Sequence, residues 1–506
     1  MPAARPPEHR RLIATRTGLV QVRLMGVGPP LAALHATPGS SLDLVPLGRA
    51  LGARHTVILP DTPGYGWSDP LPFTRPTAAD LADAIAEALG LLGVANAPFL
   101  GAHTGAQIAL EIGVRHPRLM SGLVAEGLPL LTPAERESWH AGTLPPFEPL
   151  ADGTHLAWAW ARARDGAVFM PFNIAGVSAR SPRAFPPVEA IHGAFLELHR
   201  AGRRWRDGYD AAFRHETAER LHAFEKPLKV TCRPGDTLFS HLARVPAAHA
   251  LAPAPVDLEG FAGTLASILA SFAPGTLAPA PALPGARGLV AAGGGAVHVR
   301  LAEGPGAPVV MLHGPGRGTR GFQPTLARLR GRRAAIAIDL PGTGGSDPLA
   351  EPTLEHLLAC LGETLAARGA ERPTILGDGP AAGLAWALAA RVGGVALGVG
   401  PTTAEAPLDL APRLDGGHVM AAWWRVRDRR LWSDPETKLA AGALDHPVGH
   451  DPEQLDRETL DILEGRTFDP ALATMIAALP PPARPSTIDR RQPHALADLI
   501  ADASRA

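Results

Sequence analysis

Two glycines four positions apart, Gly101 and Gly105, enclose His103 between a short apolar run and a helical stretch. This spacing is that of the nucleophile elbow, Gly-x-Ser-x-Gly, in which a strand of a parallel sheet turns sharply into a helix. Glycine is needed where the backbone and the helix come too close for a Cβ atom. The pattern therefore predicts a strand–turn–helix unit with the side chain of residue 103 at its tip, and it has histidine where the motif has serine.

One set of motifs occurs twice along the 506 residues. His35 ends an apolar run and Asp61 begins an Asp-x-Pro-Gly-x-Gly-x-Ser-Asp-Pro loop, whereas His313 and Asp339 hold the same places further on. Both pairs have the same offset (313 − 35 = 278 and 339 − 61 = 278). A common register over this length indicates duplication of one domain and not a short-period solenoid.

Apolar and helical segments alternate around these motifs. Short apolar runs typical of buried parallel strands occur at residues 31–34, 56–59, 98–100, 122–125 and 228–232. Helical patterns lie between them, for example at 77–92 and 105–115. The alternation predicts an α/β fold, with a mostly parallel sheet covered by helices on both faces.

A stretch rich in proline and alanine, residues 274–286, divides the chain. Proline disfavours helix in the residue before it, so we expect an extended linker there. The predicted domains are therefore residues 1–273, with a helical cap at about 130–215, and residues 287–506.

With the strand-end turn, the Asp-x-Pro-Gly loop and the elbow in this order, the chain resembles the α/β-hydrolase superfamily. The resemblance covers most of residues 12–272 and, less completely, about 288–506. It implies two fused α/β-hydrolase-fold domains, each with a helical cap. It also implies a triad in the chain order serine, acid, histidine.

The triad positions of that superfamily are only partly filled in this chain. The nucleophile position is His103 in the first copy and Gly379 in the second, so we expect the second domain to be catalytically inactive. Asp236 matches the acid position in the first copy. No histidine follows the strand expected near residues 256–258, where the superfamily has its last triad member.

Each candidate catalytic residue has two interpretations. His103 could act as a base or nucleophile, because imidazole titrates near neutral pH, or it could mark a lapsed elbow. Asp236 could orient that imidazole, or it could simply belong to a Gly-Asp turn. His155, in a cap segment that recurs at His418, could reach the substrate or could pack in a helix interface.

The loop after the first motif is expected to line an oxyanion hole. Backbone N–H groups near Thr37 and at Thr104 would then donate to a substrate oxygen. We assign His35 to the same substrate-binding loop, with the alternative that it only holds the loop by hydrogen bonds.

Composition limits the partners. Hydrophobic residues make up 46% and charged residues 19% of the chain, and the formal net charge is -1, which favours neither nucleic acid nor a membrane surface as partner. Cys232 and Cys360 lie in different halves and in no metal-ligand spacing, so we expect no metal and a cytoplasmic location. No signal segment, membrane-spanning run or phosphate-binding loop is found in the sequence, so no cofactor is predicted.

These observations predict an enzyme that acts on a small-molecule substrate, namely an ester, thioester or activated carbonyl compound, with non-standard catalytic residues. Two alternatives stay open: a non-catalytic pseudoenzyme that binds a ligand, and a cofactor-free lyase on the same fold. The duplication also suggests an intramolecular pseudo-dimer of the two domains.

Overall fold

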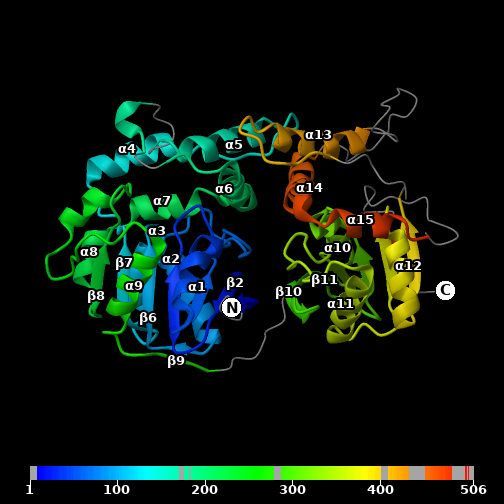
Figure 1. Ribbon diagram of the computed structural model, residues 1–506, viewed down its shortest axis with the longest axis horizontal. Coiled ribbons are helices and arrows are strands. Elements are labelled where there is room, and N and C mark those ends of the chain that lie inside the picture. Colours follow the sequence, from blue (N-terminus) through cyan, green and yellow to red (C-terminus); the bar gives the residue numbers. More distant parts are fainter. Residues whose placement is uncertain are drawn as a thin grey trace. The chain divides into compact units, whose positions relative to one another are not determined.

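The computed structural model describes residues 8–169, 176–181, 184–278, 286–400, 408–431, 451–480, 496–498 and 500. The chain divides into two compact units (Figure 1). Unit 1 comprises Met1–Glu148 and Trp158–Pro284, and unit 2 comprises Pro149–Ala157 and Gly285–Ala506. The segment Pro149–Ala157, which we expected in the cap of the first domain, thus groups with unit 2.

Unit 1 contains a seven-stranded sheet in the order β1-β2-β4-β3-β6-β7-β8. Its strands are β1 (Glu8–Thr15), β2 (Gly18–Met25), β3 (Pro30–Leu34), β4 (Thr56–Pro60), β6 (Ala97–Ala102), β7 (Met120–Glu126) and β8 (Leu228–Thr231). The five strands from β3 to β8 are parallel and are those predicted from apolar runs. The antiparallel hairpin of β1 and β2 was not predicted, because polar residues interrupt its apolar positions.

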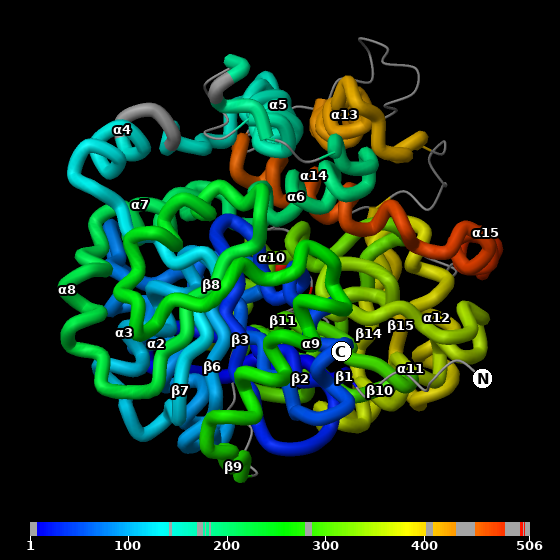
Figure 2. Tube along the Cα trace, turned by 60° about the vertical axis from the view of Figure 1, so that its left-hand side comes forward, coloured from blue at the N-terminus to red at the C-terminus, as the bar shows by residue number. Residues whose placement is uncertain are grey.

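Helices cover both faces of this sheet (Figure 2). The helices α2 (Ala78–Leu91) and α3 (Thr104–Arg115) pack on one face, and α1 (Val45–Leu51) and α9 (Leu258–Leu269) pack on the other. A capping box at Thr77 fixes the start of α2, because its side chain and that of Asp80 satisfy backbone N–H groups that the helix leaves free.

Further helices lie beyond the carboxyl ends of the strands in unit 1 (Figure 1). They are α4 (Pro133–Thr143), α6 (Val188–Ala201) and α7 (Asp207–Arg214), whereas α8 (Thr217–His222) lies beside the sheet against α3, and α5 (Thr154–Gly166) begins in residues of unit 2. Part of the predicted linker is ordered: Thr276–Leu277 form strand β9, which pairs with β5 (Val94–Ala95). Residues 279–285 of that linker lie outside the described residues.

Unit 2 contains a six-stranded sheet in the order β10-β11-β13-β12-β14-β15. The strands are β10 (Arg287–Ala292), β11 (Gly295–Ala302), β12 (Val309–Leu312), β13 (Ala335–Ile338), β14 (Thr374–Asp378) and β15 (Val395–Val399). Its helices are α10 (Gln323–Leu329), α11 (Leu354–Ala367), α12 (Ala381–Val392), α13 (Gly417–Leu431), α14 (Pro452–Glu464) and α15 (Pro470–Ala477). The strand order repeats that of unit 1, without a counterpart of β8 in the described part of the chain. The predicted fold class, two α/β domains with mostly parallel sheets, is therefore confirmed. None of the helices in the described ranges is long and apolar enough to cross a bilayer.

Candidate active site

The predicted strand–turn–helix unit is present in unit 1. Strand β6 ends at Ala102 and helix α3 begins at Thr104, which leaves His103 between them with φ 51° and ψ −115°. A Cβ atom at Gly101 would lie 2.5 Å from Cα of Ala106, and one at Gly105 would lie 2.4 Å from the carbonyl oxygen of Leu34. The close approach of strand and helix thus accounts for both glycines of the motif.

The backbone conformation of His103 predicts a measurable cost in stability. A positive φ is unfavourable for every residue with a Cβ atom and costs of order 1–3 kcal/mol. We therefore expect His103→Gly to be more stable than His103→Ala by about 1 kcal/mol, after allowing for the greater flexibility of glycine in the unfolded chain. Both variants lack the imidazole, so the difference between their free energies of unfolding in urea measures the cost of the backbone conformation alone. Equal stabilities would contradict a strained turn.

Asp236 holds the imidazole of His103. Nε2 of His103 lies 3.0 Å from Oδ1 and 3.1 Å from Oδ2 of Asp236, and Oδ1 also accepts a hydrogen bond from the N–H of Leu238 at 2.9 Å. The side chain of Asp236 is 4% exposed, whereas that of His103 is 30% exposed. Because a neutral imidazole has one donor and one acceptor nitrogen, donation from Nε2 leaves the lone pair on Nδ1.

Cys232, whose thiol is influenced by the charge of Asp236, is not suited to act as a nucleophile beside this pair. Burial, followed by the charges of Asp236 and Glu126, raises the pKa of the Cys232 thiol to about 12. A thiol with this pKa stays protonated at neutral pH and is a poor nucleophile. Glu126 itself accepts a hydrogen bond from Nε of Arg233 at 2.8 Å.

The predicted oxyanion donor at Thr37 is engaged within the protein. Its N–H donates to Oγ1 of Thr104 at 2.8 Å, and the Thr104 hydroxyl donates to Oγ1 of Thr37 at 2.9 Å. Helix α7 closes the same place, since a Cβ atom at Gly208 would lie 2.5 Å from Oγ1 of Thr37. In this structure the N–H of Thr37 itself is therefore engaged by the side chain of Thr104, and an oxyanion donor near Thr37 stays a prediction.

His35 holds its own loop. Its Nε2 accepts a hydrogen bond from the N–H of Thr62 at 2.9 Å, and its Nδ1 lies 2.9 Å from the carbonyl oxygen of Ala36. The side chain is buried. Both ring nitrogens are thus occupied, which fits the structural alternative and not substrate binding.

His155 lies in the segment that belongs to unit 2. Its Nε2 is 2.9 Å from Oδ1 of Asp456, its Nδ1 accepts from the N–H of Leu150 at 3.0 Å, and its ring stands edge-on to Trp423. Both ring nitrogens of His155 are therefore engaged within unit 2, which fits the packing alternative better than a role at a substrate. Sequence spacing predicted that His155 lies in the cap of the first domain, but it could not show that the ring packs within unit 2.

The two units hold corresponding motif residues by corresponding bonds. The N–H of Leu340 donates to Nε2 of His313 at 3.0 Å, as the N–H of Thr62 does to His35. Two further bonds correspond between the units. In unit 1, Asp61 accepts from the N–H of Ser41 at its side chain and from the hydroxyl of Ser68 at its carbonyl oxygen. In unit 2, Asp339 accepts in the same way from the N–H of Thr319 and from the hydroxyl of Ser346. The elbow position of unit 2, between β14 and α12, is Gly379, which has no side chain to react.

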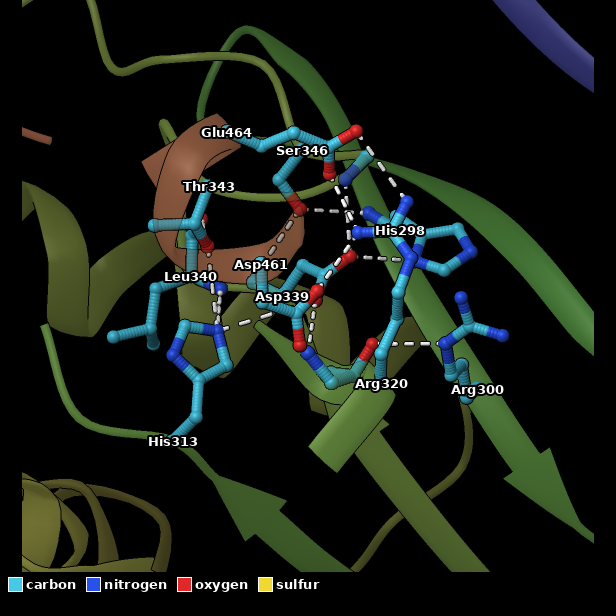
Figure 3. Close-up of polar contacts among 12 residues, drawn as sticks. His298, Arg300, His313, Arg320, Asp339, Leu340, Thr343, Ser346, Asp461 and Glu464 are labelled. Atoms are coloured by element: carbon cyan, nitrogen blue, oxygen red, sulfur yellow. Dashed lines mark hydrogen bonds and ion pairs between the residues drawn. The ribbon is translucent and has the colours of Figure 1, made fainter. Parts of the chain in front are cut away.

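In unit 2 a buried charged cluster surrounds the Asp-x-Pro-Gly loop (Figure 3). Nη1 of Arg320 donates to Asp461 at 2.7 Å and to Glu464 at 2.6 Å, and Asp339 accepts from Nδ1 of His298 at 2.8 Å. Burial raises the pKa of Asp461 to about 7, although the charge of Arg320 opposes the shift, and burial lowers the pKa of His298 to about 4.

The raised pKa of Asp461 predicts a pH-dependent stability. Between its usual value of 3.8 and about 7, the folded carboxyl keeps a proton that the unfolded one has lost. The contribution of Asp461 to stability therefore falls as pH rises through this window, by about 1.4 kcal/mol per pH unit. We expect Asp461→Asn to gain stability relative to the wild type between pH 4.5 and 7.5 in urea titrations. A constant difference between Asp461→Asn and the wild type over this pH range would disprove the raised pKa.

Other features of unit 1 lie apart from this site. A cavity of about 330 Å³ is lined by residues of α2, α3, α7 and α8, among them Glu111, Arg214 and His215, and not by His103. In the described part of the chain, no group of three or more His, Cys, Asp or Glu residues is arranged to hold a metal ion.

Sequence reasoning did not single out His241, which lies on the same loop as the candidate acid. We expected a strand near residues 256–258 with no triad histidine after it, but the structure has no strand there, and Asp257 instead caps α9. His241 follows Asp236 by only five residues, in the 3-10 helix η4 (Phe239–Arg244), and its Nδ1 accepts from the N–H of Leu130 at 3.0 Å. The one signal in the sequence that could have drawn attention to His241 was its place in the loop that carries the candidate acid, Asp236.

Comparison with known proteins gives one family match and several similar structures. Residues 29–148 match the family described as alpha/beta hydrolase fold. A hydrolase from Pseudomonas aeruginosa PA01 is 20% identical, with 53% of this chain and 100% of that chain covered and a TM-score of 0.38. Epoxide hydrolase A from Mycobacterium thermoresistibile is 18% identical, with 53% and 99% covered and a TM-score of 0.41. An N-acyl homoserine lactonase is 21% identical, with 52% and 95% covered and a TM-score of 0.38.

Proposed function

On the α/β-hydrolase fold that this chain carries, we propose that unit 1 is an enzyme in which Nδ1 of His103 acts as general base. The observation that supports this role is the contact of Nε2 with both carboxylate oxygens of Asp236, at 3.0 and 3.1 Å. The carboxylate fixes the tautomer with the lone pair on Nδ1 and stabilises the imidazolium that forms when the base takes a proton. The substrate class is a small ester, thioester or activated carbonyl compound.

The bond between Thr37 and Thr104 favours one reaction type within this class. Acyl transfer through a tetrahedral intermediate needs N–H donors for the oxyanion, and loss of one donor costs about 10²–10³ in rate. The N–H of Thr37 already donates to Thr104. Removal of a proton from the carbon beside a carbonyl group needs only a base and one donor to the oxygen. We therefore propose a lyase or a related carbonyl proton-transfer enzyme ahead of a hydrolase.

A panel of substrates tests this assignment. The wild type and His103→Gln are incubated with aryl esters, aryl thioesters and activated ketones that carry an acidic C–H bond. Product formation is followed by absorbance, and exchange of the C–H proton in D₂O is followed by ¹H NMR. We expect the ketones to exchange the C–H proton or to eliminate a leaving group, in a reaction that depends on His103. Hydrolysis of the aryl esters and thioesters should be slower. Turnover that is equal in both proteins would refute the role of His103.

The same closed pair of threonines supports a second candidate, a binding protein without turnover. In that case the site would bind members of the panel in calorimetric titrations, yet neither exchange nor product would appear after long incubation. Binding that His103→Gln leaves intact would point the same way.

We also propose that unit 2 arose by duplication and performs no catalysis, since Gly379 stands at its elbow. The matching bonds at His35 and His313 support a common origin. Cys232 and Cys360 are both buried free thiols, which fits the reducing cytoplasm as the location.

A further inference from the structure

His241 lies on the same loop as the acid that holds His103. The carboxylate of Asp236 accepts from the N–H of Leu238, and the carbonyl oxygen of Leu238 accepts from the N–H of His241 at 2.9 Å. The Asp236 carboxylate thus touches the imidazole of His103 on one side and the turn that carries His241 on the other.

The loop after strand β7 contacts both histidines. Strand β7 leads into Gly127, where a Cβ atom would lie 2.7 Å from Cδ2 of His103. Three residues later, the N–H of Leu130 donates to Nδ1 of His241. The loops after β8 and β7 therefore each contact His103 and His241, which places both imidazoles in one region of unit 1.

The bond from Leu130 sets the tautomer of His241. A nitrogen that accepts a hydrogen bond has no proton, so the neutral ring carries its proton on Nε2. Among the described residues, no hydrogen-bond partner is found for this Nε2–H group. The ring packs beside Trp139, with centroids 6.3 Å apart, and is buried.

Burial and nearby charges favour the neutral form of His241. Burial lowers its pKa first, the charges of Arg244 and His103 add to this effect, and only Glu135 opposes it. Arg244 is held in place by Glu135 at 2.6 Å and by the carbonyl oxygen of Leu130 at 2.7 Å. A neutral imidazole with a fixed N–H is a hydrogen-bond donor suited to an oxygen that gains negative charge, as in sites where an electrophilic histidine faces a carbonyl oxygen.

We propose that His241 is a second catalytic residue of the site, whose Nε2–H donates to the carbonyl oxygen of the substrate in place of the engaged N–H of Thr37. This inference rests on the proposed function and narrows its substrate class to carbonyl compounds with an acidic C–H bond. His103 takes the proton from the carbon, the electron pair of that C–H bond forms a C=C bond, and the carbonyl π pair moves to the oxygen that His241 holds. The enolate then takes a proton back or expels a leaving group from the next carbon.

The first measurement needs no substrate. In ¹⁵N-histidine-labelled wild-type protein, we expect His241 to give the neutral Nε2–H pattern at pH 8 and to gain its second proton at a lower pH than an exposed histidine, because its pKa is lowered. Addition of 4-nitrophenolate, an oxyanion probe, should shift its Nε2–H proton downfield. An Nδ1–H tautomer, a protonated ring at neutral pH or an unmoved proton at saturating probe would overturn the proposal, whether or not a substrate is ever found.

The second measurement compares His241→Leu with His241→Gln, whose amide can still donate. We expect the leucine variant to bind 4-nitrophenolate about ten- to a hundredfold more weakly and to lower kcat about 10²–10³-fold with little change in KM, as for loss of one oxyanion donor. If His241→Gln partly restores probe binding and kcat, then the loss in His241→Leu results from the missing hydrogen-bond donor and not from altered packing. Equal binding by the wild type and the leucine variant contradicts the role of His241. If the panel shows no turnover but the probe results hold, only the proposed catalysis fails and the donor assignment stands.

Discussion

Replacement of His103 by glutamine should lower kcat/KM by two to four orders of magnitude on the substrate that the panel identifies. The reason is that general-base catalysis by a positioned imidazole contributes about 10²–10⁴ in rate. Glutamine keeps a donor that can reach Asp236, but its amide is not a base at neutral pH. Steady-state kinetics at pH 7.5, with circular dichroism to show that the variant is folded, measure the effect.

Asp236→Asn should produce a loss of similar size for a different reason. Asparagine can donate to Nε2 of His103, which would place the imidazole proton on Nδ1 and remove the lone pair that acts as base. The chain offers a matched control in His116, whose Nε2 lies 2.7 Å from Asp83 and whose side chain is 37% exposed. His116→Gln removes an equivalent His–Asp pair away from the elbow and should leave kcat/KM unchanged. Equal losses in the control and at His103 would show a general effect on the fold and not catalysis.

The sequence predicted the parts of this molecule that local patterns determine. The close approach of strand and helix requires glycine at 101 and 105, and the apolar runs of the five parallel strands are typical of buried parallel sheets. The pairing of His103 with Asp236 was predicted from the resemblance to the α/β-hydrolase superfamily, which implies an acid after a late strand.

The remaining features depend on contacts that sequence spacing does not contain. The Thr104 hydroxyl takes the N–H of Thr37 only because the loop and the first turn of α3 meet at hydrogen-bond distance. His155 enters the core of unit 2 because Asp456, some three hundred residues later, is there to accept from it. The tautomer of His241 depends on a backbone N–H from a different loop.

The largest loss of stability is expected for Arg320→Met in unit 2. Arg320 is buried, and its Nη1 lies 2.7 Å from Asp461 and 2.6 Å from Glu464. Burial lowers the pKa of Arg320, but the two neighbouring carboxyl groups outweigh burial and hold that pKa above its usual value. Removal of the cation leaves two carboxyl groups buried without it, and breaking a buried ion pair in this way typically costs about 3–5 kcal/mol. Urea unfolding followed by tryptophan fluorescence and circular dichroism measures the change.

Two further variants separate the charge from the packing in this prediction. Arg332→Met removes an exposed pair with Asp498 at 3.3 Å and should change the free energy of unfolding by less than about 1 kcal/mol. The triple variant Arg320→Met, Asp461→Leu and Glu464→Leu should recover most of the lost stability, because apolar side chains of similar volume replace a buried charged cluster without the cost of desolvation. If the triple variant is as unstable as Arg320→Met alone, then side-chain shape at this place, and not uncompensated charge, determines the stability of unit 2.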